Sequence, residues 1–128
     1  MRANLITISG YWNMGLAATL LCPPFYHFLG INLKQPVWGW VIAAFLLYTA
    51  AVLIISGRNI QKYGSIVIHE ALLRFIAAVL LIPAGLFYDY GFIVAFLGFT
   101  DALWGFLYLR IVPENTGRSL KQLLLDQD

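Results

Sequence analysis

The chain has 128 residues, of which 61% are hydrophobic and 11% are charged, and its formal net charge is +2. A soluble globular domain carries charged residues at about twice this frequency. The apolar residues here form long blocks instead of amphipathic stripes, which excludes an ordinary soluble domain. The basic residues form no stripe and accompany no stacked aromatic platform, so we expect no nucleic-acid partner.

Four apolar segments are each long enough to cross a membrane, because a hydrocarbon core of about 30 Å requires about 20 helical residues. We expect these spans at residues 5–29, 37–55, 64–87 and 92–112. The connections between them are short, which favours antiparallel neighbours. The sequence therefore predicts an all-α integral membrane domain over residues 1–115, folded as a four-helix up-down bundle.

Prolines modify two of the expected spans. Pro23 and Pro24 predict a kink in the first, because proline removes a backbone donor and clashes with the preceding turn. Pro113 predicts the end of the fourth span. The first apolar run is longer than that of a signal peptide, and the pair of leucines before Cys22 does not resemble a lipoprotein cleavage site. We therefore expect the first span to be retained.

The positions of Lys and Arg predict the orientation, because positively charged loops stay in the cytoplasm. If the spans alternate in direction, six basic residues fall on the side of the two termini, and Lys34 falls on the opposite side. Both termini are therefore expected in the cytoplasm, and the chain is expected to be a multi-pass protein of the inner (plasma) membrane. The six residues are Arg2, Arg58, Lys62, Arg110, Arg118 and Lys121.

Residues 116–128 form a mainly polar tail in which Leu120, Leu123 and Leu124 recur at helical spacing. Thr116 or Ser119 could cap the first turn of such a helix. Two interpretations are open: a short helix on the inner membrane surface, or a frayed chain end.

Charged side chains lie inside the third and fourth spans. At a rise of about 1.5 Å per residue, Glu70 lies about 9 Å and Arg74 about 15 Å from the cytoplasmic side, and Asp101 lies about 14 Å from the other side. Glu70 and Arg74 share a helical face and could pair within the helix. Because consecutive antiparallel helices are usually neighbours, we predict a bridge between Arg74 and Asp101. Asn13 could join this network as donor and acceptor.

Three roles are open for this cluster. It could hold the helices in one register, as polar contacts between membrane helices commonly do. It could form a polar pocket in which Arg74 anchors an anionic or carbonyl-bearing group, because ionisable residues inside a membrane often mark sites. Glu70 and Asp101 could also form a proton pathway.

His69 is a further candidate for the polar network, and it also raises the question of a haem. His69 and His27 differ in height by about 20 Å, so one haem cannot use both. The single cysteine, Cys22, excludes an internal disulfide and a cysteine-rich metal site. We expect no metal and no cofactor.

The second half of the chain carries Ser56-Gly57-Arg58, Lys62-Tyr63 and a run from Gly98-Phe99-Thr100-Asp101 to Leu109. In these residues the chain resembles the DoxX-like group of small four-helix bacterial membrane proteins. The resemblance implies a bacterial inner-membrane protein, in some members an accessory subunit linked to quinone or sulfur redox chemistry.

The sequence contains no nucleophile elbow, zinc-protease motif, Walker loop, dinucleotide glycine pattern or paired cysteine motif. We therefore expect a non-catalytic binding or accessory subunit whose Glu/Arg/Asp cluster binds the polar head group of a lipophilic ligand. The expected partners are the lipid bilayer, a ligand such as a quinone or lipid, and further copies or a larger membrane complex. The alternative is an oligomer that translocates protons or solutes through the same cluster.

Overall fold

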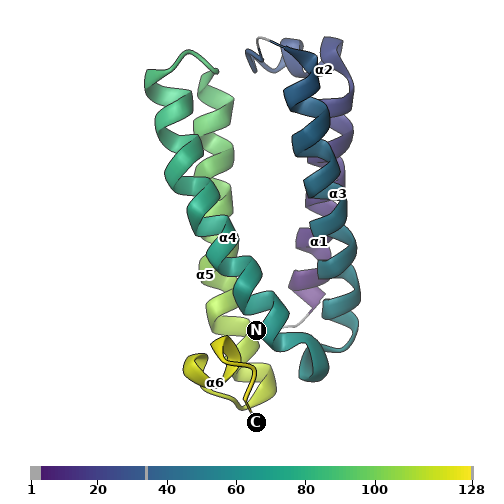
Figure 1. Ribbon diagram of the computed structural model, residues 1–128, viewed down its shortest axis with the longest axis vertical. Helices are drawn as coiled ribbons and strands as arrows, with labels where there is room; N and C mark the ends of the chain where they lie inside the picture. The colour runs from purple at the N-terminus through teal and green to yellow at the C-terminus, as the bar shows by residue number, and fades with distance from the viewer. Residues whose placement is uncertain (1–3, 34, 128) are drawn as a thin grey trace.

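The computed structural model describes residues 4–33 and 35–127, and these residues form helices and connections without a strand. Four helices are long and two are short (Figure 1). Their bounds are Asn4–Leu21 (α1), Pro23–Phe28 (α2), Pro36–Arg58 (α3), Ile60–Phe87 (α4), Phe92–Thr116 (α5) and Leu120–Leu124 (α6).

Three of the described helices, α3, α4 and α5, are long and apolar enough to cross a membrane, as expected for a membrane protein. The first helix, α1, is not among them, because Asn4 and Asn13 lower its mean hydropathy. The first predicted segment, residues 5–29, is interrupted at its prolines as expected, and the interruption is a complete break between two helices instead of a kink within one. The helix ends at Leu21, and the two prolines begin the separate helix α2, because neither can supply the backbone N–H that a continuous helix needs.

The long helices pair as two antiparallel hairpins, α1 with α3 and α4 with α5 (Figure 1). They alternate in direction, and the start of α1 and the short helix α6 lie toward the same end of the molecule. We call this the lower end. The hairpins diverge upward from it, so the four helices do not close around one continuous packed core.

Glycine allows the close approach of helices within each hairpin. A Cβ atom on Gly10 would lie 2.8 Å from Cγ1 of Ile54, and one on Gly98 would lie 2.8 Å from Cγ1 of Ile82. Since lipid provides no hydrophobic drive for helix association, such close packing is a main source of attraction between membrane helices. The small residues therefore lie within the pairs, and the boundary between the pairs is less closely packed.

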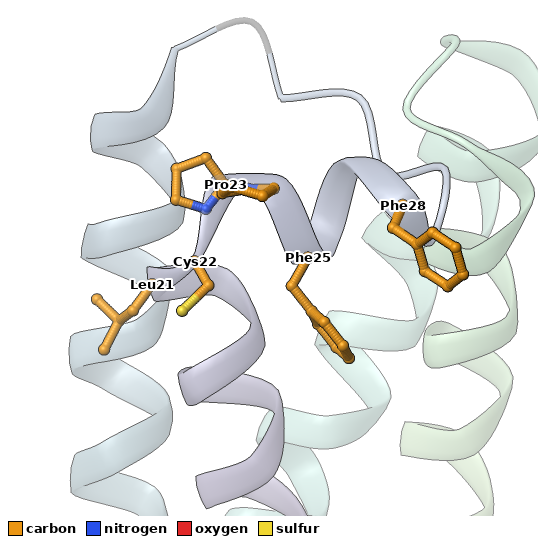
Figure 2. A pocket seen from close by; sticks show the side chains of 6 residues that line it. Leu21, Cys22, Pro23, Phe25 and Phe28 are labelled. Atoms are coloured by element: carbon orange, nitrogen blue, oxygen red, sulfur yellow. The ribbon is translucent and has the colours of Figure 1, made fainter.

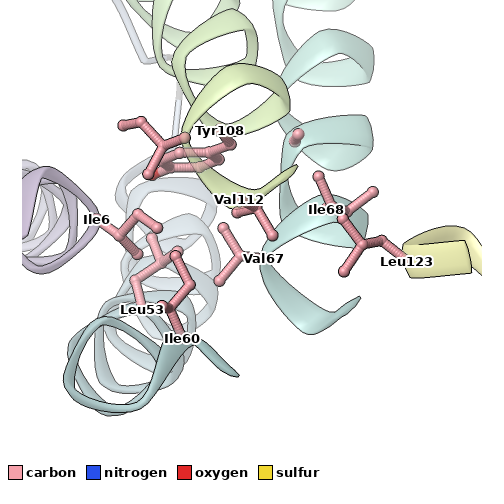
Figure 3. Packing of buried hydrophobic residues seen from close by; sticks show 10 residues of the cluster. Ile6, Leu53, Ile60, Val67, Ile68, Tyr108, Val112 and Leu123 are labelled. Atoms are coloured by element: carbon pink, nitrogen blue, oxygen red, sulfur yellow. The ribbon is translucent and has the colours of Figure 1, made fainter. Parts of the chain in front are cut away.

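A lower core of buried apolar side chains joins the two hairpins near Asn59, the residue between α3 and α4 (Figure 3). It contains residues of α1, α3, α4, α5 and α6. The side chains labelled in Figure 3 are Ile6, Leu53, Ile60, Val67, Ile68, Tyr108, Val112 and Leu123.

At the opposite end, α2 and residues 29–33 connect the hairpins and form a roof. Tyr26 and Ile31 pack against Val94 of α5, and the backbone N–H of Asn32 donates to the carbonyl of Tyr90 at 2.8 Å. The hairpins therefore meet at the lower core and again at the roof, and a space remains between their upper halves.

The prediction that the fourth helix ends at Pro113 is wrong. α5 continues to Thr116 and ends at Gly117, whose φ of 71° is in the left-handed region and whose N–H donates to the carbonyl of Pro113. The hydroxyl of Thr116 also donates to the carbonyl of Val112 at 2.7 Å. Proline removes one helical hydrogen bond, and the surrounding bonds allow the helix to continue for a further turn.

The tail forms a helix, α6, that packs on the protein. Ser119 and Gln122 form a reciprocal capping box at its start. Leu123 is fully buried, and the hydroxyl of Ser65 on α4 donates to its carbonyl. The structure agrees with a helical tail, and packing against α4 explains why so short a helix is formed, whereas its predicted place on the membrane surface stays a prediction.

Candidate functional site

A network of hydrogen bonds connects all four long helices at mid-height. Nη1 of Arg74 donates to Oδ1 of Asp101 at 2.7 Å, and Nη2 of Arg74 donates to Oδ1 of Asn13 at 3.0 Å. Nδ2 of Asn13 in turn donates to Oγ1 of Thr49 at 3.0 Å. The polar network thus takes one side chain from each helix: Asn13 (α1), Thr49 (α3), Arg74 (α4) and Asp101 (α5).

The network is shielded from the surroundings of the protein. Arg74 is 4% exposed and Asn13 is 3% exposed. The guanidinium carbon of Arg74 lies 5.4 Å from the centre of the Tyr108 ring, and the hydroxyl of Tyr108 donates to the hydroxyl of Ser9. Nε of Arg74 is buried and has no hydrogen-bond partner among the described residues.

The predicted bridge between Arg74 and Asp101 is present, and Asn13 joins the network. The predicted pair of Glu70 and Arg74 within α4 is absent: within residues 4–33 and 35–127, Glu70 forms no ion pair or hydrogen bond. The guanidinium is held toward α1 and α5 by its two bonds, which draws it away from the preceding turn. Glu70 still lies within electrostatic range of Arg74 and Asp101.

His69 does not belong to the network. Its Nδ1 lies 2.8 Å from the carbonyl oxygen of Ser65, one turn earlier in the same helix. With the proton on Nδ1, this contact is a hydrogen bond within α4. In the part of the chain that the structure describes, no group of three His, Cys, Asp or Glu residues could hold a metal ion.

A cleft of about 890 Å³ lies between the hairpins, within the range of sites for small molecules. Side chains of α1, α3, α4 and α5 line it together with the roof and the connection before α5. The lining residues are Leu16, Thr19, Leu20, Ile31, Leu33, Gln35, Trp38, Ile42, Leu46, Ala77, Leu80, Leu81, Ala84, Tyr90, Val94, Leu97 and Asp101.

The polar network forms the floor of this cleft. Leu16 lies one helical turn above Asn13, and Ala77 lies one turn above Arg74. Asp101 belongs both to the network and to the cleft lining. An apolar space thus ends below at a carboxylate that is paired with a buried guanidinium.

A second hollow of about 550 Å³ lies at the junction of α1 and α2 (Figure 2). It is lined by Leu21, Cys22, Pro23, Pro24, Phe25 and Phe28, so the thiol of Cys22 is its one polar side chain. Without further polar groups to orient a ligand, this hollow is a weaker candidate than the cleft.

Two members of the site were missed at the level of the sequence. Thr49 completes the link between α1 and α3, and Tyr108 lies against the guanidinium. Thr49 could have been found as a polar residue inside an apolar span, although its hydroxyl also bonds within its own helix, to the carbonyl of Leu46. Tyr108 resembles the interfacial tyrosines of other spans, and its position gave no signal.

No family model, curated protein or solved structure matches this chain. The resemblance to the DoxX-like group therefore stays a prediction.

Proposed function

We propose that the protein is a non-catalytic membrane subunit that holds a lipophilic ligand in the cleft, with the polar end of the ligand at the floor. The observation that carries the proposal is an apolar space of about 890 Å³ that contains the carboxylate of Asp101. Large apolar pockets with a few convergent polar groups are the usual form of small-molecule sites. A cluster that served packing alone would not need an open volume above it.

In the proposed arrangement the lower end of the molecule faces the cytoplasm of a bacterial cell, and the protein lies in the inner membrane. The distribution of basic residues supports this orientation. The helix α1 crosses the membrane beside α3, and its polar residues Ser9 and Asn13 are buried within the protein, away from lipid. The cleft then lies in the outer half of the bilayer, between the network at mid-height and the roof.

Translocation of protons or solutes is the second candidate, and one observation favours it. Glu70 lies below the network and has no bonded partner among the described residues. Glu70 and Asp101 would therefore be two successive carboxylates on a path from one end of the molecule to the other. The lower core argues for binding instead, because its buried apolar side chains, including Leu53 and Val67, fill the space between the hairpins below the network. A path through one copy would have to cross this core.

A blocking substitution tests the proposed function. Ala77→Phe would place an aromatic ring in the cleft just above the floor, whereas Val79→Phe would add the same ring on the outer surface of α4, where Val79 is 71% exposed. We expect the unsubstituted chain and the V79F control to copurify with a hydrophobic small molecule that native mass spectrometry detects. We expect A77F to retain roughly tenfold less of it, a loss of about 1.4 kcal/mol in binding. Equal retention by both variants would contradict the proposal.

A further inference from the structure

The lining of the cleft also indicates the chemistry of the ligand. Building on the proposed function, we propose that the ligand is a single-chain alcohol or a lipid with an equivalent hydroxyl head group. The hydroxyl donates a hydrogen bond to the carboxylate of Asp101, and the chain extends toward the roof. This differs from the expectation that Arg74 anchors an anionic or carbonyl group.

Arg74 is poorly placed to receive a ligand. It is not among the residues that line the cleft, it is 4% exposed, and both of its terminal nitrogens already donate to protein oxygens. Its one unpartnered donor, Nε, is buried. A ligand that required the guanidinium would have to displace Asn13 or Asp101 first.

Asp101 is the accessible polar group at the floor. Its side chain is 17% exposed, and it alone among the residues that line the cleft carries a charge. Oδ1 accepts the bond from Arg74, and no hydrogen bond from the described residues reaches Oδ2. An ionised carboxylate only accepts hydrogen bonds, so a carbonyl or an anion would meet lone pairs there, whereas a hydroxyl would donate to it.

The paired charges at the floor favour a neutral donor over a cation. Arg74 lies 2.7 Å from Asp101 and compensates its charge. A cationic head group would lose its bound water on entering this dry apolar space. It would find no uncompensated negative charge there to replace that water, so its binding is strongly unfavourable. A hydroxyl group loses far less hydration and still satisfies the second carboxylate oxygen.

The depth of the cleft matches an alkyl chain. Asp101 lies in the third turn of α5, about 14 Å below the start of that helix at about 1.5 Å per residue. This is close to the thickness of one leaflet, about half of a 30 Å hydrocarbon core. Between the floor and the roof, α4 and α5 contribute apolar side chains that include Leu81, Val94 and Leu97. The lining contains two hydroxyl groups, on Tyr90 near the roof and on Thr19 of α1, and that of Thr19 donates to the carbonyl of Gly15.

Trp38 provides a reporter for this arrangement, because it lines the cleft and belongs to the first turn of α3, near the roof. In the variant W12F/W40F/W104F, Trp38 is the remaining tryptophan. Quenching of its fluorescence by brominated undecanol in detergent micelles measures binding. The matched control W12F/W38F/W104F retains Trp40, which does not line the cleft and reports partition into the micelle.

Three probes of equal chain length, each brominated at the terminal carbon, separate the head groups: undecanol, its methyl ether and undecanoate. We expect saturable quenching of Trp38 by the alcohol, about tenfold weaker binding of the ether, which lacks the donor, and still weaker binding of the carboxylate. Trp40 should show only the non-saturable background. A fourth probe is undecanol with bromine on the carbon next to the one that bears the hydroxyl. It should quench Trp38 less than the terminally brominated alcohol, because the bound hydroxyl would hold this bromine near Asp101 at the floor.

The outcomes distinguish the two proposals. Equal saturable binding of all three probes, or stronger binding of the carboxylate, would overturn the hydroxyl assignment and leave the cleft as a lipophilic site. Stronger quenching by the bromine beside the hydroxyl would show the reverse orientation and also overturn it. Absence of saturable binding by every probe would overturn the proposed function itself. Native mass spectrometry of the unsubstituted chain with the same probes repeats the comparison without tryptophan replacements.

Discussion

Nη1 of Arg74 lies 2.7 Å from Oδ1 of Asp101, and this ion pair joins α4 to α5 near the middle of both helices. The carboxylate faces the cleft, whereas the guanidinium lies behind it and extends the network to α1 through Asn13. The pair therefore has two separable roles, since Arg74 holds the helices together and Asp101 presents an acceptor to the cleft.

Removing one partner of this pair should destabilise the protein more than removing both. Arg74→Leu leaves a carboxylate in the interior without its cation, and we expect a loss of about 3 kcal/mol in the free energy of unfolding. The double variant R74L/D101N contains neither charge and should recover part of that loss. Unfolding in detergent, followed by circular dichroism, measures both values.

The matched control for this prediction is Arg110→Leu. Arg110 pairs with Glu114 one turn away at 3.3 Å, but its side chain is 70% exposed. We expect R110L to lower stability by less than about 1 kcal/mol. If R74L were as mild as R110L, the interior pair would not stabilise the fold.

The link between the hairpins should depend more on Asn13 than on Thr49. Asn13→Leu removes the acceptor of Nη2 of Arg74 and the donor to Thr49, so a buried guanidinium nitrogen loses its partner. We expect a loss of about 2 kcal/mol. Thr49→Val removes one neutral bond and should lower stability by about 0.6 kcal/mol, the average for such bonds between membrane helices. Thermal unfolding of the two variants checks the order, and a larger effect of T49V would contradict it.

Two glycines of α1 should respond in opposite ways to alanine. A Cβ atom on Gly10 would lie 2.8 Å from Cγ1 of Ile54 and 3.0 Å from the carbonyl oxygen of Ala50, so Gly10→Ala should push α1 away from α3 and lower stability by about 1–3 kcal/mol. Gly15 has nothing within 4 Å of that position, so Gly15→Ala should be neutral or stabilising by up to about 1 kcal/mol. Melting temperatures of the purified variants compare the two, and equal effects would refute close packing at Gly10.

The C-terminal helix should contribute to the stability of the lower end through one side chain. Leu123 is fully buried in the lower core, so Leu123→Ala should lower the free energy of unfolding by about 2–3 kcal/mol through the loss of apolar contact and the cavity that remains. Leu124 is the neighbouring control, because it is exposed and its replacement by alanine should change stability by less than about 1 kcal/mol. An equally mild L123A would indicate that α6 is not docked in solution.

The proposed orientation can be tested by cysteine labelling. In a background with Cys22→Ser, Tyr88→Cys places a thiol between α4 and α5 and Lys121→Cys places one in α6. A membrane-impermeant maleimide should label Y88C in intact spheroplasts and K121C only after lysis, because basic regions remain in the cytoplasm. The reverse pattern would place both termini outside.

The three helices of membrane-spanning length and the positions of the charges along them could be predicted from the residues alone, because both follow from local chemistry. An apolar run of about 20 residues forms a helix in lipid, since every backbone group must be satisfied within the segment. The heights of Arg74 and Asp101 followed from counting residues at a constant rise, so their contact could be predicted. Two predictions were wrong, the end of a helix at Pro113 and the pairing of Arg74 with Glu70. Both outcomes depend on hydrogen bonds that surrounding residues supply. α5 passes Pro113 because neighbouring bonds support it, and Arg74 turns away from Glu70 because Asn13 and Asp101 lie in other helices.

The division into two hairpins and the cleft between them were decided by packing between helices. Gly10 and Gly98 show that helices approach closely within each pair, but a glycine in the sequence does not indicate which helix it will face. The sequence likewise does not reveal that α2 lies across the upper end or that Asp101, not Arg74, faces the open space. These features depend on how distant segments fit together in three dimensions, whereas the helices and their charges follow from local composition and constant helical geometry.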